Sequence, residues 1–190
     1  MDTIFILNSK GETYTIKNNS NFQNCMGYAF NKKAWLVPIV DEEYLWDIAY
    51  DMTEDEYEVA DIFDALRLQM EEDISSILKI EDPNQIEEIY SNIAQERDLS
   101  TTTAAAIITA RILSYFPEVR TISSEKELKP NEDLIVFAGG RGDFHFVKYS
   151  NYIISHKQGE FTEETLSYIE DGFSPLYTSE RVYFAAARRD

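Results

Sequence analysis

Three residues of this chain have side chains suited to thiol catalysis: its single cysteine, Cys25, and its two histidines, His145 and His156. A thiolate is a strong nucleophile, and an imidazole with a pKa of about 6.5 can take and return a proton near neutral pH. One thiol, one base and one group that orients the base are the minimum for thiol catalysis. Whether the three residues can act together depends on the secondary-structure elements that position them.

The two histidines lie on a predicted β-hairpin that spans residues 142–159. Apolar and aromatic residues flank Ser150-Asn151, and Asn tolerates the left-handed backbone of a tight turn. With Ser150 and Asn151 as the turn pair, His145 faces His156 directly, with Cβ atoms about 5 Å apart. The hairpin thus predicts a base beside a second imidazole.

The cysteine lies at the predicted start of a helix. Asn24 is a good N-cap, so Cys25 takes the first helical position, where free amides and the helix dipole favour a thiolate. Gly27 leaves room for another element to approach closely. The backbone amide of Cys25, with a side chain such as Asn24, Gln23 or Tyr28, could stabilise an oxyanion.

The remaining pattern predicts a small N-terminal hairpin, a helical segment and then an antiparallel sheet, which is an α+β arrangement. Residues 1–190 are expected to form one domain, with residues 41–116 as a helical insertion. The apolar run 134–138 is expected in the centre of the sheet. Residues 139–142 suggest a turn, and residues 162–170 a short helix that ends at Gly172.

Composition limits the possible partners. The net charge is −18, which argues against a nucleic-acid groove or binding to an anionic membrane. Neither a signal peptide nor a membrane-spanning apolar run is recognised, so a cytoplasmic protein is expected, with signal-independent export or delivery as an effector left open. Acidic residues gather in the helical segment, between Asp51 and Asp73. They favour a solvated surface, or alternatively a docking surface for a basic protein.

Three short motifs around Cys25, His145 and His156 resemble those of a known group of enzymes. Asn24-Cys25-x-x-Tyr28-Ala29, then Asp143-Phe144-His145-Phe146 and Ser155-His156-Lys157-Gln158-Gly159, is similar to papain-like cysteine hydrolases related to the NlpC/P60 enzymes. The resemblance implies a papain-like antiparallel sheet with a cysteine-bearing helix. It also implies Cys25 as nucleophile, His145 as base and His156 as orienting residue. Met26, Gly27 and Gln158 depart from the pattern, and the helical insertion has no counterpart in it.

The function expected from these residues is a cysteine peptidase or amidase that cleaves an amide, peptide or isopeptide bond through a Cys25 thioester. Deamidation and transfer use the same groups and stay open. The substrate also stays open: the resemblance implies a peptidoglycan peptide, and an intracellular protein is the alternative. Such chemistry needs no cofactor and no metal. Three alternatives remain: a Cys-His-His zinc site, a catalytically silent scaffold that serves as an acidic immunity or inhibitor module, and a purely structural cysteine.

Overall fold

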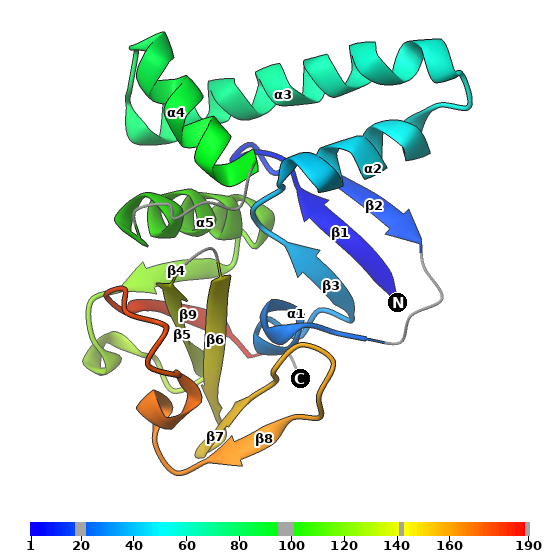
Figure 1. Cartoon of the computed structure of the whole chain (residues 1–190). Coiled ribbons are helices and arrows are strands. Elements are labelled where there is room, and N and C mark those ends of the chain that lie inside the picture. Colours follow the sequence, from blue (N-terminus) through cyan, green and yellow to red (C-terminus); the bar gives the residue numbers. More distant parts are fainter. Residues whose placement is uncertain (18–21, 95–100, 141–142, 189–190) are drawn as a thin grey trace.

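The protein is a mixed α+β structure with two sheets and a layer of helices (Figure 1). The computed structural model describes residues 1–17, 22–94, 101–140 and 143–188. The predicted α+β class is confirmed.

The helices are α1 (Cys25–Ala29), α2 (Glu42–Met52), α3 (Glu56–Leu78), α4 (Pro83–Ala94) and α5 (Thr101–Tyr115), with 3₁₀ turns η1 (Glu125–Glu127) and η2 (Ile169–Gly172). The strands are β1 (Asp2–Ile6), β2 (Thr13–Lys17), β3 (Ala34–Val37), β4 (Val119–Ile122), β5 (Glu132–Gly140), β6 (Asp143–Ser150), β7 (Ile153–His156), β8 (Glu164–Leu166) and β9 (Val182–Ala187).

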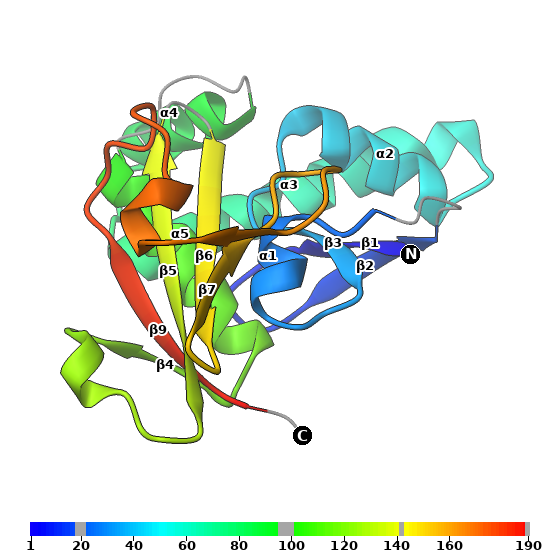
Figure 2. The same ribbon diagram turned by 90° about the horizontal axis from the view of Figure 1, so that it is seen from below.

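The smaller sheet has the order β2-β1-β3 and confirms the predicted N-terminal hairpin. Strand β3 adds to β1 in parallel. Helix α1 connects β2 to β3 and contacts both β3 and β6. Seen from below in Figure 2, α1 lies between the two sheets. This position gives the cysteine-bearing helix its access to the larger sheet.

The larger sheet has the order β4-β9-β5-β6-β7-β8, so β5 is an interior strand, as its apolar sequence predicts. Its alternate residues serve two cores. Ile135 and Phe137 pack with α1 and α5, whereas Leu134 and Val136 pack with Phe173 on the opposite face. A strand that is covered on both faces needs no polar alternation.

The histidine hairpin forms, but its register differs from the prediction by two residues. The turn residues are Asn151 and Tyr152, with φ of 50° and 67°, and Ser150 pairs with Ile153. His156 therefore faces Val147 rather than His145. Because side chains alternate with a period of two, the shift leaves His145 and His156 on one face as diagonal neighbours. Tyr rarely takes the left-handed conformation, which is why the sequence did not identify it as a turn residue.

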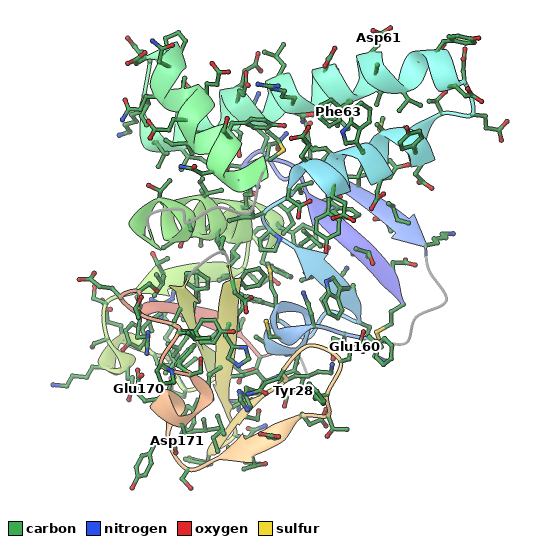
Figure 3. All side chains as sticks on the ribbon, viewed as in Figure 1. Tyr28, Asp61, Phe63, Glu160, Glu170 and Asp171 are labelled. Atoms are coloured by element: carbon green, nitrogen blue, oxygen red, sulfur yellow. The ribbon has the colours of Figure 1, made fainter. Side chains whose placement is uncertain are left out.

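The helical segment packs against the smaller sheet and shares its core. Its buried apolar stripe includes Leu45, Ile48, Phe63 and Met70 and joins Phe5 of β1. In Figure 3 the side chain of Phe63 points toward α2, whereas Asp61 points outward. The acidic residues are mostly exposed, as predicted, with one exception.

That exception is Asp73, which is buried and paired with the equally buried Arg111 of α5 at 3.2 Å. The sequence assigned Asp73 to the solvent-facing acidic surface, which is wrong. A carboxylate can be buried when a guanidinium and further donors satisfy it. The ion pair fixes α3 against α5.

Two further expectations after the central strand need correction. Residues 162–170 do not form a helix: Glu164–Leu166 form β8, and η2 follows. Gly139 and Gly140 belong to β5 rather than to a turn, and residues 141–142 lie outside the described part of the chain. Within that described part, every helix is too short or too polar to cross a membrane.

Candidate active site

Cys25 is the first residue of α1, as predicted. The side-chain oxygen of the N-cap Asn24 accepts a hydrogen bond from the Gly27 amide at 3.0 Å. Gly27 is needed for packing, because a Cβ there would come within 2.2 Å of the Ala34 carbonyl oxygen. The close contact between α1 and the start of β3 therefore depends on this glycine and fixes the position of the cysteine.

The thiol of Cys25 lies against β6 and is buried. Burial raises the thiol pKa to about 12 and outweighs the backbone amides of Phe146 and Met26, which favour a thiolate and lower the pKa. The sequence predicted the opposite direction. A helix of five residues has a weak dipole, and the apolar surroundings disfavour the charged form. The thiol is therefore neutral in the unliganded protein.

The two imidazoles form a hydrogen-bonded chain. His145 Nε2 lies 2.8 Å from His156 Nδ1, and His156 Nε2 lies 3.3 Å from Glu164 Oε2. A carboxylate can only accept, so His156 Nε2 carries a proton, and in the tautomer that this bond selects Nδ1 accepts. His145 Nε2 must then donate, which leaves His145 Nδ1 as a free acceptor. Glu164 thus fixes the tautomer of both rings.

Glu164 was not recognised in the sequence. It pairs with His156 in the register of β7 and β8, a pairing that the predicted helix over residues 162–170 excluded. In a helix this carboxylate would have no defined relation to the histidines. A prediction of strand in place of helix would have indicated it.

His145 is packed between aromatic rings. The Tyr177 ring stacks on it at 5.8 Å between centroids, and Phe173 meets it edge-on at 5.9 Å. Burial, then the neighbouring His156, lowers the pKa of His145 to about 4. With this low pKa, His145 is neutral near pH 7 and takes up a proton only when a neighbouring group transfers one to it directly.

Tyr177 and Asp143 form a second polar pair beside the same ring. The Tyr177 hydroxyl donates to Asp143 Oδ2 at 2.9 Å, and burial together with this carboxylate raises the pKa of Tyr177. Asp143 also raises the thiol pKa of Cys25 through its negative charge. Tyr177 lies 32 residues beyond His145 with no motif around it, so no sequence signal identified it.

Gly172 allows η2 to lie directly over the histidines. A Cβ at this position would come within 2.4 Å of Val147 Cγ2 and within 3.3 Å of His156 Nδ1. Any side chain would force η2 away from the imidazole pair. The sequence found this glycine but assigned it only to a helix end.

The side chains predicted to support an oxyanion have other partners. Asn24 donates to the Leu36 carbonyl at 2.7 Å, and Gln23 donates to the Lys32 carbonyl at 2.8 Å. The Tyr28 hydroxyl donates to Ser155 Oγ at 2.8 Å and so ties α1 to β7. Of the three, only Asn24 lines the cleft next to Cys25.

Lys157 connects the two sides of the site. Its buried ammonium donates to the backbone carbonyls of Gln23, just before α1, and Gly159, just after β7. Burial lowers the pKa of this ammonium, whereas the nearby Cys25 raises it. The residue that follows His156 thus ties the cysteine segment to the loop before β8.

Cys25 and His145 open into one cleft of about 810 Å³. Residues from β3, α2, β6 and the segment after η2 line it, and so does the loop before β8, which carries Glu160 (Figure 3). The site therefore combines a thiol, an imidazole and a cleft large enough for a ligand. His156 stands behind His145 and outside the cleft lining.

The alternative of a zinc site finds no support in this geometry. Three of the four ring nitrogens of His145 and His156 bond to each other or to Glu164 rather than converging on one point. Within the described residues there is no cluster of three or more histidine, cysteine or acidic side chains that could hold a metal.

Comparisons of the chain with family models, curated proteins and solved structures find no match. The structure is that of an α+β protein in which a buried thiol and one histidine of a hydrogen-bonded pair line the same cleft.

Proposed function

We propose that the protein is a cysteine hydrolase of papain-like type that cleaves or transfers an amide bond through a thioester on Cys25. The proposal rests on the hydrogen-bonded series His145–His156–Glu164. This series leaves Nδ1 of His145 as an acceptor, and His145 lines the same cleft as the thiol. A histidine pair with a purely structural role would not need an unbonded acceptor nitrogen beside a cysteine.

The first step transfers the thiol proton to His145 Nδ1 while the sulfur attacks the substrate carbonyl. The neutral resting pair makes this transfer concerted with attack, since neither the thiolate nor the imidazolium is stable on its own in the buried site. The imidazolium is then stabilised through His156, whose far nitrogen bonds to the Glu164 carboxylate. His156 and Glu164 act as positioning residues.

The second step breaks the bond to the leaving group. The imidazolium returns its proton to the departing amine, and a thioester remains on Cys25. Water, or an acceptor amine in the transfer reaction, then attacks the thioester with His145 as base. The backbone amides of Cys25 and Met26 at the start of α1 are the donors best placed for the oxyanion, because the side chains of Gln23 and Tyr28 are engaged elsewhere.

Acylation by an activated ester tests the proposal. Incubation with a p-nitrophenyl ester should add one acyl group to the wild-type chain, detected by intact mass and removed by hydroxylamine, as expected for a thioester. The chain has a single cysteine, so Cys25→Ala is a complete control. Equal acylation of wild type and Cys25→Ala would mean that lysines react and that the thiol is inert.

A second candidate is a non-enzymatic interaction module. Tyr50, Met52 and Tyr57 are exposed around the turn between α2 and α3, among acidic residues, and Tyr57 is 91% exposed. Such a surface suits a basic partner with an apolar patch. The two candidates separate on the Cys25→Ala variant: an interaction module retains every activity after this change, and a hydrolase does not.

A further inference from the structure

We infer that the cleft takes a neutral or cationic peptide segment with a bulky apolar side chain and rejects a carboxylate beside the scissile bond. This inference rests on the proposed function and names its substrate class. It follows from two independent features of the cleft, its aromatic walls and the sign of its charge.

Aromatic side chains from separate parts of the chain form the walls. Trp35 of β3 and Tyr44 of α2 line the cleft on the side of the smaller sheet, and Phe144 and Phe161 line it on the side of the larger one. Phe161 is 72% exposed, so apolar surface is available for a ligand to cover. Rings on both sides favour an apolar side chain between them.

The size of the cleft fits a peptide rather than a single small group. Its volume of about 810 Å³ is in the upper part of the usual range for ligand sites, roughly 300–1,000 Å³. Tyr44 gives the helical segment a direct part in the cleft. The insertion thus contributes to substrate choice as well as to the acidic surface.

The charge of the cleft is negative. Asp143 and Glu160 are the ionisable carboxylic acids of its lining, and among its described residues there is no lysine or arginine. The nearest buried cation, Lys157, has its ammonium bonded to two backbone carbonyls. The whole chain carries a net charge of −18, which adds a field of the same sign. A substrate carboxylate would meet repulsion without a compensating donor, whereas an ammonium would be attracted.

The experiment compares esters that present different side chains to the same reaction. Wild-type protein is acylated with the p-nitrophenyl esters of benzyloxycarbonyl-phenylalanine, -lysine and -glutamate, and with p-nitrophenyl decanoate. The rate constant for the Cys25 adduct is measured by intact mass. We expect the phenylalanine and lysine esters to react at least about tenfold faster than the glutamate ester, with a difference that shrinks in 0.5 M salt.

Variants identify the source of the discrimination. Glu160→Gln removes one cleft charge and should raise the rate of the glutamate ester relative to that of phenylalanine. Glu88→Gln makes the same change on the exposed surface of α4, away from the cleft, and should leave the ratio unchanged. Trp35→Ala should slow the phenylalanine ester most.

The outcomes separate the two proposals. Acylation of Cys25 at equal rates by all three amino acid esters, or fastest by glutamate, overturns the inference and leaves the hydrolase proposal standing. A decanoate rate about tenfold above that of phenylalanine would assign the cleft to an acyl chain and also overturn it. If no ester modifies Cys25, the proposed function fails, and the inference with it.

Discussion

Two groups of buried polar side chains stand in contrast in this fold. Arg111 and Asp73 join α5 and α3 and are satisfied on every side: Arg111 also donates to the Pro38 carbonyl at 2.7 Å, and Asp73 accepts from the Ser9 amide at 2.9 Å. The group around Cys25 and His145 is equally buried, but it ends in a free acceptor and opens into a cleft. Burial alone therefore does not mark a functional site. A polar network that is completely satisfied holds elements together, whereas an incomplete one at a cleft has capacity left for a ligand.

Removal of one partner from the satisfied network should cost the most stability. Arg111→Ala leaves the Asp73 carboxylate buried without its partner, so the free energy of unfolding should fall by about 3–5 kcal/mol. Urea denaturation followed by circular dichroism measures this. The double variant Arg111→Met/Asp73→Leu should recover most of the loss. A single-variant loss below about 1 kcal/mol would show that water reaches the pair and that the contrast is wrong.

The next effect concerns the pH dependence of stability. The pKa of His145 is lowered from 6.5 to about 4 in the folded protein, so the unfolded chain binds the proton more readily between these values. The contribution of the neutral imidazole to the free energy of unfolding is fully present above about pH 6.5. It falls by about 3 kcal/mol as the pH falls toward 4. Carboxylates also titrate in this range, so the measured quantity is the difference in slope between wild type and His145→Gln. Parallel stability curves would contradict a buried neutral imidazole.

A smaller effect sharpens the role assigned to Glu164. Glu164→Gln keeps the shape but no longer fixes the tautomer of His156, and the acylation rate of Cys25 should fall about tenfold. The effect is limited because the Glu164 side chain is 64% exposed. Glu163→Gln, on the neighbouring exposed residue, is the matched control and should change little. Equal acylation rates for the two variants would show that Glu164 has no part in the reaction of Cys25.

The smallest effect concerns the charge next to the thiol. Asp143 raises the pKa of Cys25, so Asp143→Asn should lower it and increase the thiolate fraction at a given pH. Alkylation by iodoacetamide at pH 8.5 should become about threefold faster, although wild-type Cys25 should still react more slowly than free cysteine. Asp64→Asn on α3 is the control. A slower reaction of Asp143→Asn would indicate that the carboxylate orders the site more than it repels the thiolate.

The sequence predicted the elements of the site better than their electrostatics. Local signals identified the Asn24 cap, the close approach at Gly27 and the hairpin of the two histidines. The register was wrong by two residues because Asn151 and Tyr152, rather than Ser150 and Asn151, take the left-handed conformation. The face of the strand was still right, since only an odd shift reverses it.

Burial and long-range pairing were the parts that the sequence could not supply. The helix start at Cys25 suggested a lowered thiol pKa, but the depth of the thiol in the core is a property of the whole fold and raises it. Glu164 and Tyr177 reach the histidines through strand pairing and a loop, with no spacing that marks them. The burial of Asp73 has no local sequence signal, because its partner Arg111 lies 38 residues away.

The central claim is that His145 acts as the base for Cys25, and the acylation rate of a His145→Ala variant tests it most directly. With an activated ester at pH 7.5, the rate for this variant should be about 10²–10⁴ times lower than for wild type, the usual contribution of a general base. Added imidazole, which can enter the vacated part of the cleft, should restore part of the rate. Acylation of His145→Ala at the wild-type rate, with no response to imidazole, would contradict the account.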